Sequence, residues 1–151
     1  MSTILLVTGS HTVDTVDCMW VETMLHPRLA GTQLLIAGDA CGPDTIAHEM
    51  ALNRRIKSAR WCTDGRVEYC RPTSWWDEAR WDTVETPVDP AERALARNAA
   101  MVAWCAGRMA AGDDVRALGL VVAASATHGV DHTLQLCRDA GVRITRLVWT
   151  P

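Results

Sequence analysis

Three loops in this sequence combine glycine with polar side chains, and each follows an apolar, strand-like run. The loops span residues 9–13, 38–44 and 125–129. Glycine lets a ligand approach the backbone closely, and a helix that begins after such a loop offers unpaired amide hydrogens to a phosphate. We therefore expect these loops to hold an anionic ligand. The candidate contacts in them are Gly9, Ser10, His11, Gly38, Asp39, Gly42, Asp44, Ser125 and Gly129.

Two acidic residues at these loops are candidate catalytic groups if the protein is an enzyme. Asp44 ends the second loop, and Asp131 follows the third. A carboxylate at such a position can activate water or stabilise an oxocarbenium-like ribosyl centre. An acid at the start of a helix can also act only as a cap, so both interpretations stay open. Asp39 is a more distant catalytic candidate.

Three other candidate contacts lie near the start of a predicted helix, in the segment "ARNAAM". An arginine followed by an asparagine gives no obvious packing benefit to a helix with an apolar stripe. Arg97 and Met101 are one turn apart and share a helix face. We expect these two residues and Asn98 to contact the ligand, and the alternative is a solvated Arg-Asn pair.

Several familiar sites are absent from the sequence. No G-x-G-x-x-G follows the first apolar run, and no G-x-x-x-x-G-K-[ST] occurs, which argues against an NAD dehydrogenase and a P-loop NTPase. His128 and His132 form an H-x-x-x-H pattern without a firmly placed third ligand. We therefore expect no metal site and no cofactor.

The elements that must position these residues follow from the apolar patterns. Continuous apolar runs predict strands at residues 4–7, 34–37 and 118–124. Two segments with polar residues among the apolar ones, at residues 67–70 and 144–148, bring the predicted sheet to five strands. Strands that alternate with helices indicate a mostly parallel sheet, with ligands bound beyond the carboxyl ends of the strands. Residues 54–65 are predicted to form an irregular connection, and residues 72–90 a long loop. Trp75 and Trp76 in that loop either pack it or stack on a base.

Apolar residues at helical spacing predict three of the helices and their buried faces. Asp14 is the predicted cap of the first helix, and Asp89-Pro90 begins the third. The predicted buried stripes are Val16, Met19, Trp20 and Met24; Ile46, Ala47, Met50 and Ala51; and Leu95, Ala99, Val102, Ala106 and Met109.

The composition indicates a single domain over residues 1–151, with 48% hydrophobic and 22% charged residues. The net charge of −3 argues against a nucleic-acid partner, since proteins that bind phosphate backbones are more often basic. Six cysteines without a C-x-x-C pair indicate reduced thiols and a cytoplasmic protein. No apolar stretch approaches the roughly 20 residues of a membrane span, so we expect no membrane partner.

Four segments carry a resemblance to a known family, and they occur in this order along the chain: "VTGSH", "IAGDACGPDTIAHEMA", "ARNAAM" and "VVAASATHGVDHTLQLCRDAGVRI". Together they resemble the YspA-like group of the SLOG superfamily, whose members include LOG phosphoribohydrolases and DprA-type DNA-processing proteins. The resemblance covers most of the chain, apart from residues 54–65 and parts of 72–88. It implies a Rossmann-like, three-layer α/β/α sandwich with a mostly parallel five-stranded sheet. It also places Arg97, Asn98 and Met101 over the ligand cleft.

The sequence departs from the group's pattern at three positions. His11 replaces the usual arginine of Gly-Ser-Arg, which exchanges a permanent cation for a titratable one. Asp39 replaces the second glycine of a Gly-Gly pair, where an acid either repels a phosphate or holds a ribose hydroxyl. Val130 follows Gly129 where the group has threonine, so Thr127 or Thr133 must supply that hydroxyl if it is present.

Two functions fit these residues. The first is a module or sensor that binds a nucleotide or nucleotide-derived phosphate ligand at the carboxyl edge of the sheet. The alternative is an N-glycosidase acting on nucleoside 5′-monophosphates, as the LOG relatives imply, although the LOG signature P-G-G-x-G-T-x-x-E is absent. A DprA-like role on DNA is disfavoured by the acidic charge. Sheets of this type often pair through helices, and this small domain carries seven tryptophans, so a homodimer is one expected assembly.

Overall fold

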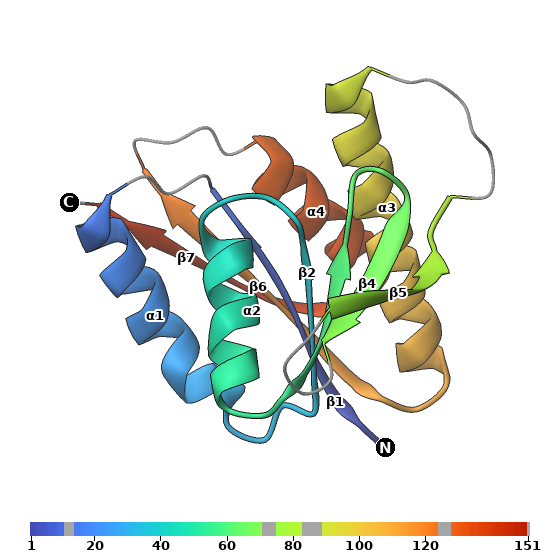
Figure 1. Ribbon diagram of the computed structural model, residues 1–151, viewed down its shortest axis with the longest axis horizontal. Helices are drawn as coiled ribbons and strands as arrows, with labels where there is room; N and C mark the ends of the chain where they lie inside the picture. The colour runs from blue at the N-terminus through green and yellow to red at the C-terminus, as the bar shows by residue number, and fades with distance from the viewer. Residues whose placement is uncertain (11–13, 71–74, 83–88, 124–127, 151) are drawn as a thin grey trace.

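The chain forms one seven-stranded sheet with helices on both faces (Figure 1). The computed structural model describes residues 1–10, 14–70, 75–82, 89–123 and 128–150. The strand order is β5-β4-β3-β2-β1-β6-β7. The strands are β1 (Thr3–Gly9), β2 (Leu34–Gly38), β3 (Lys57–Trp61), β4 (Arg66–Cys70), β5 (Trp75–Arg80), β6 (Asp114–Val122) and β7 (Arg143–Trp149).

Most of the sheet is parallel. The strand β1 pairs with both β2 and β6, β2 pairs with β3, and β6 pairs with β7, all in parallel. The strands β4 and β5 extend the sheet antiparallel at its β3 edge. The carboxyl ends of β1 and β2 therefore lie together near the middle of the sheet, where a ligand site is expected.

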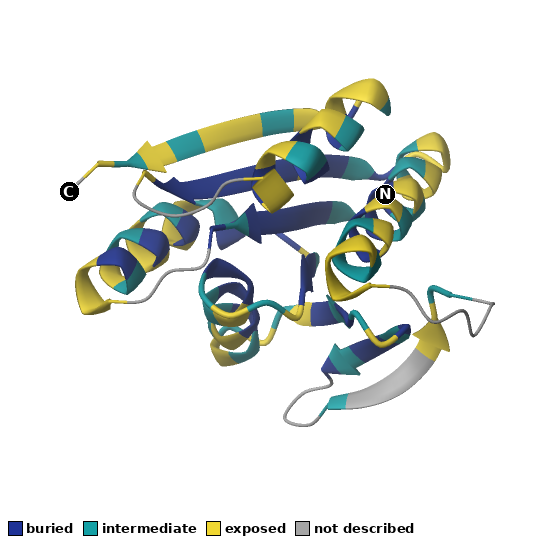
Figure 2. Cartoon of the chain, turned by 90° about the horizontal axis from the view of Figure 1, so that it is seen from above, coloured by how far each residue is buried: buried dark blue, intermediate teal, exposed yellow. Residues whose placement is uncertain are grey.

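Helices cover the two faces in pairs, which gives the predicted three-layer α/β/α arrangement. The helices are α1 (Thr15–Leu29), α2 (Pro43–Asn53), α3 (Pro90–Ala110) and α4 (His128–Asp139). Leu5, Val7 and Leu35 pack with α1 and α2 on one face, whereas Ile4 and Leu6 belong to the core under α3 and α4. Figure 2 shows the dark blue strands enclosed by these helices, while β7 at the sheet edge is largely exposed. None of the helices in the described ranges is long and apolar enough to cross a membrane.

The predicted strand count was too low. Residues 57–61 form β3, although the sequence predicted an irregular connection there, and β5 falls inside the predicted long loop. Both strands contain charged residues, although Ser58, Ala59 and Trp61 of β3 are buried, and β5 is the edge strand of the sheet. The predicted strand at residues 67–70 is β4, and it runs antiparallel to its neighbours rather than joining the parallel set.

The predicted faces of two helices were also wrong in part. Val16 and Met19 of α1 are exposed, and the buried residues of that helix include Val21, Leu25 and Leu29, which recur every four positions. Of the predicted α3 stripe only Val102 is buried, because the helix turns its Arg-Asn face inward. The cap of α1 is as predicted, since the side chain of Asp14 accepts a hydrogen bond from the Asp17 amide at 2.8 Å.

Candidate functional site

A cavity of about 330 Å³ opens at the carboxyl ends of β1 and β2, below the first turns of α3 and α4. We call it the first cavity. Apart from the predicted ligand contacts, its wall is mostly apolar and includes Val7, Ala94, Leu95 and Val130. The structure brings eight of the predicted ligand contacts to this cavity: Gly9, Ser10, Gly38, Asp44, Arg97, Asn98, Met101 and Gly129.

Asp44 is the unusual group of the first cavity. It is the second residue of α2, and it is only 5% exposed. Its Oδ1 atom has no hydrogen-bond partner among the described residues. Burial raises the pKa of the carboxyl to about 7, and the guanidinium of Arg97 and the amides of Ala40 and Gly38 only partly oppose this. The carboxyl therefore exchanges a proton near neutral pH.

Arg97 joins α3 to the ends of two strands. Its Nη1 donates to Oδ1 of Asp39 at 2.7 Å and to the carbonyl of Trp61 at 3.1 Å. Its Nε donates to Oδ1 of Asn98 at 2.8 Å. The residue is buried, so these bonds fix a positive charge between Asp39 and Asp44. This arrangement explains why a helix with an apolar core side carries the Arg-Asn pair.

Two glycines at the site are required by the packing of the protein itself. A Cβ on Gly38 would collide with the Arg97 guanidinium and lie 2.9 Å from Oδ2 of Asp44. A Cβ on Gly9 would overlap the ring of Pro43, so Gly9 allows α2 to begin directly against β1. The backbone of Gly42 has φ of 90°, a conformation that favours glycine at the cap of α2. Gly129, by contrast, has open space around its Cα.

The other predicted residues differ in their relation to the first cavity. The Oγ of Ser10 accepts a hydrogen bond from the Val122 amide at 3.0 Å and so joins the end of β1 to β6. Thr133 is fully buried and donates to the carbonyl of Gly129 at 2.9 Å, but it does not line the cavity. Asp131 is exposed and pairs with Arg146 of β7 at 3.1 Å, away from the cavity lining. His11 and Ser125 lie outside the described residues.

Comparisons with known proteins leave the family open. No family model matches the sequence, and no curated protein matches it. One solved structure with a related arrangement is DNA processing protein A (DprA) from Streptococcus pneumoniae, at 17% sequence identity and a TM-score of 0.43. The match covers 95% of this chain and 58% of that protein. This likeness is too distant to assign a family or a function.

A second cavity, of about 370 Å³, lies between α2 and the β3–β4–β5 strands, and Gly38 lines both cavities. Asp39, predicted as a ligand contact, belongs to the lining of this second cavity. Sequence reasoning missed Arg60 and Cys62 because residues 54–65 gave no apolar run, and it missed His48 and Glu68 because the helix and strand that carry them were not expected to face a cavity. The available signal was the alternation in "KSARW" and "RVEYC", which places every second side chain on one face of a sheet.

Proposed function

We propose that this protein binds a nucleotide or a nucleotide-derived phosphate ligand in the first cavity and acts as a sensor or ligand-binding module. The observation that carries this proposal is Asp44, a buried carboxyl with an unpartnered oxygen in a mostly apolar cavity. Burying a polar atom without a hydrogen bond costs free energy, so a partner for that oxygen is expected in the functional state. The resemblance of the loop sequences to the SLOG superfamily supports the same class of ligand.

The start of α2 favours an anion in this position. Gly42 caps the helix without any side-chain hydrogen bond, and Pro43 has no amide hydrogen, so the first amide that α2 offers to an acceptor is that of Asp44. The helix dipole adds positive potential at the same place. Asp44 tolerates a nearby phosphate because its protonated form donates a hydrogen bond to a phosphate oxygen. Its ionised form accepts one from a ribose hydroxyl.

Isothermal titration calorimetry tests this proposal with AMP, GMP, CMP, UMP and inorganic phosphate. We expect at least one nucleotide to bind, with affinity that rises between pH 8 and pH 6 as Asp44 takes up its proton. Asp44→Asn should remove this pH dependence, whereas the surface substitution Asp131→Asn should retain it. Absence of binding by every nucleotide to the folded protein would refute the proposal.

A second candidate function is hydrolysis of the N-glycosidic bond of a nucleoside 5′-monophosphate. The pKa of about 7 favours it, because Asp44 is then partly protonated at neutral pH and is suited to protonate a departing base. Incubation with AMP, CMP and deoxynucleotide analogues, followed by chromatography for free base, tests this activity. Base release that Asp44→Asn abolishes and Asp131→Asn retains would support the enzyme, and absence of release from every substrate would refute it.

We also infer that the partner is a small molecule rather than a nucleic acid. The net charge of −3 supports this, since an electrostatic DNA site relies on an excess of basic side chains. A gel shift with single- and double-stranded DNA at low salt tests the inference. A complex that disappears with added salt would contradict it.

A further inference from the structure

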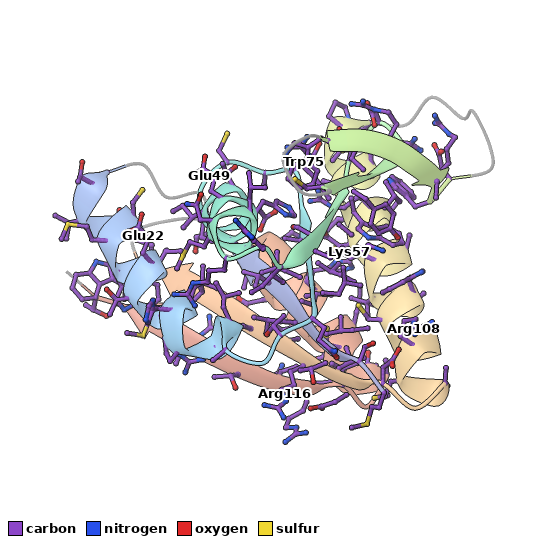
Figure 3. The ribbon with its side chains drawn as sticks, turned by 60° about the horizontal axis from the view of Figure 1, so that its bottom comes forward. Glu22, Glu49, Lys57, Trp75, Arg108 and Arg116 are labelled. Atoms are coloured by element: carbon purple, nitrogen blue, oxygen red, sulfur yellow. The ribbon has the colours of Figure 1, made fainter. Side chains whose placement is uncertain are left out.

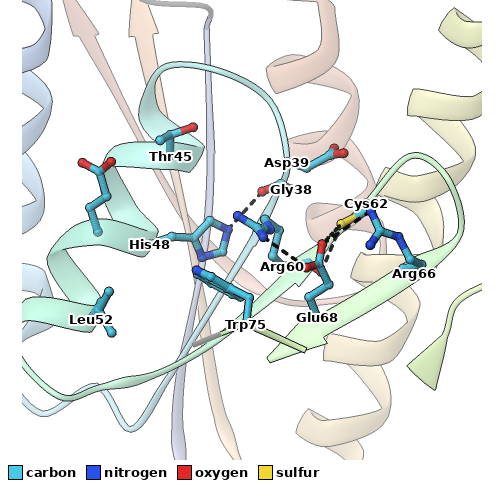
Figure 4. A pocket seen from close by; sticks show the side chains of 11 residues that line it. Gly38, Asp39, Thr45, His48, Leu52, Arg60, Cys62, Arg66, Glu68 and Trp75 are labelled. Carbon is cyan, nitrogen blue, oxygen red and sulfur yellow. Dashed lines mark hydrogen bonds and ion pairs between the residues drawn. The ribbon is translucent and has the colours of Figure 1, made fainter. Parts of the chain in front are cut away.

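The second cavity has walls from three parts of the chain. Glu49 projects from α2 and Trp75 from β5 (Figure 3), and the close view shows both helix and strands around the same space (Figure 4). Arg60 and Glu68 face each other across β3 and β4, where they are register partners. The volume of about 370 Å³ is in the range of small-molecule sites.

Hydrogen bonds and ring contacts hold these walls in place. Both oxygens of Glu68 are engaged, one by the Cys62 thiol at 2.9 Å and the other by Nη2 of Arg60 at 3.1 Å. The Arg60 guanidinium lies 4.1 Å from the ring centroid of Trp75, a cation–π contact that holds both side chains at the cavity wall. Side chains of these two types are suitable partners for a flat ring, since arginine and aromatic planes both stack on bases.

His48 adds a neutral, apolar edge to the cavity. Its Nε2 donates to the carbonyl of Gly38 at 3.0 Å, and Ser58 Oγ donates to its Nδ1 at 2.5 Å. Both ring nitrogens are therefore occupied. Burial lowers the pKa of His48 to about 4, so the ring stays uncharged at neutral pH. It also meets the Trp75 ring edge-on, with 5.2 Å between the centroids.

The charges around the second cavity select against a phosphate. The carboxylates of Asp39, Glu49 and Glu68 line it, and both arginines, Arg60 and Arg66, already pair with acids. Both oxygens of Asp39 already accept hydrogen bonds, from Arg97 and from the Thr63 amide, so among the described residues of the lining the carboxylate that remains for a ligand is that of the exposed Glu49. A neutral ring with an exocyclic amino group fits this acceptor, because an amino group donates to a carboxylate.

We propose that the second cavity binds the amino-bearing nucleobase of the ligand, while its ribosyl phosphate occupies the first cavity. The ligand then crosses from one cavity to the other at Gly38, which lines both. Asp39, which lines the second cavity and is bonded to Arg97 of the first, lies where a ribose hydroxyl would pass. This division of the ligand between the two cavities rests on the proposed function, but each cavity is tested with a separate ligand.

Calorimetry with adenosine, ribose 5-phosphate and AMP separates the two halves. Adenosine reports on the second cavity and ribose 5-phosphate on the first. We expect Trp75→Leu to weaken adenosine and AMP binding about tenfold, since the stacking of one base on an aromatic ring is worth about that much. Ribose 5-phosphate binding should stay unchanged. Trp20→Leu is the matched control, because Trp20 stacks on Trp149 away from both cavities.

Glu49→Arg provides a second variant that does not depend on the packing of Trp75. Glu49 is an exposed rim residue, so its substitution leaves the fold intact and removes an acceptor from the cavity mouth. Adenosine is uncharged, so a loss of its binding reports on this contact. UMP, whose base has no exocyclic amino group, should bind more weakly than AMP.

The outcomes are distinct. If AMP binds no more tightly than ribose 5-phosphate, the base site is overturned and the proposed function stays intact. The same conclusion follows if both Trp75→Leu and Glu49→Arg leave adenosine binding unchanged. Adenosine binding without any effect of the phosphate overturns the proposed function of the first cavity and retains the base site. No binding of any of the three ligands overturns both.

Discussion

Replacing Asp44 with asparagine should stabilise the protein at alkaline pH. The substitution keeps the shape of the side chain and removes its charge. The pKa of Asp44 rises from 3.8 to about 7 on folding because the carboxyl is buried. A shift of about 3 pKa units corresponds to about 4 kcal/mol of free energy, which is the cost of ionising Asp44 in the folded state.

The sign of the pH dependence follows from proton counting. Between pH 4 and pH 7 the folded state holds a proton on Asp44 that the unfolded state has lost, so this residue makes stability fall as pH rises. His48 acts in the opposite direction, because burial lowers its pKa to about 4. Its effect is the same in both proteins and cancels in the difference. The asparagine variant should therefore gain stability relative to wild type from pH 4 to pH 7, and the gain should level off near pH 8.

Urea denaturation of both proteins from pH 4.5 to pH 8.5 measures this difference. Asp131→Asn is the matched control, since it removes the same charge from an exposed position. Its effect should stay within about 0.5 kcal/mol and vary little with pH. A difference between wild type and Asp44→Asn that does not change across this range would refute the assignment of Asp44 as a buried carboxyl in the first cavity.

Three further predictions test the packing and the surface. Gly38→Ala should destabilise the protein by about 2 kcal/mol, because the new methyl group displaces Arg97, whereas Gly129→Ala should be near neutral; urea denaturation compares the two. His48→Gln should remove the part of the loss of stability that appears as pH falls from 6.5 to 4, since His48 takes up a proton in the unfolded state but not in the folded state. Urea denaturation over the same pH range measures the change in the free energy of unfolding. Met19→Glu should shift the protein toward monomer in sedimentation equilibrium if α1 forms a homodimer contact, because Met19 is exposed; a monomeric wild type would contradict the dimer.

The central part of the fold was predictable because its strands are buried on both faces. Residues 4–7 and 34–37 are continuous apolar runs, and they form the core of β1 and β2. The polar strands β3 and β5 were missed, since neither is a continuous apolar run and both are held in the sheet by pairing with neighbouring strands, β3 with β2 and β4, and β5 with β4. The face of α1 was misjudged because Val16 and Met19 also recur at helical spacing, and only the packed sheet decides which stripe is buried.

The candidate site was predictable as a place but not as a set of interactions. Loops after β1 and β2 converge because parallel strands end at the same edge, so Ser10, Gly38 and Asp44 come together. The sequence did not reveal that Arg97 pairs with Asp39, since these residues are 58 positions apart. Nor did it show that Gly9 has a packing role against Pro43, which requires knowledge of how closely α2 approaches β1.

The position of β1 has a consequence for how the protein folds. This strand lies between β2 and β6, and its amino-terminal end is tied to a residue 111 positions away, through the bond from the Ser2 amide to Asp113. Such pairings give a high contact order, and closing so long a loop is entropically costly. We therefore expect slower folding than in a helical bundle of equal length. During synthesis the first strand must wait for β6 to leave the ribosome.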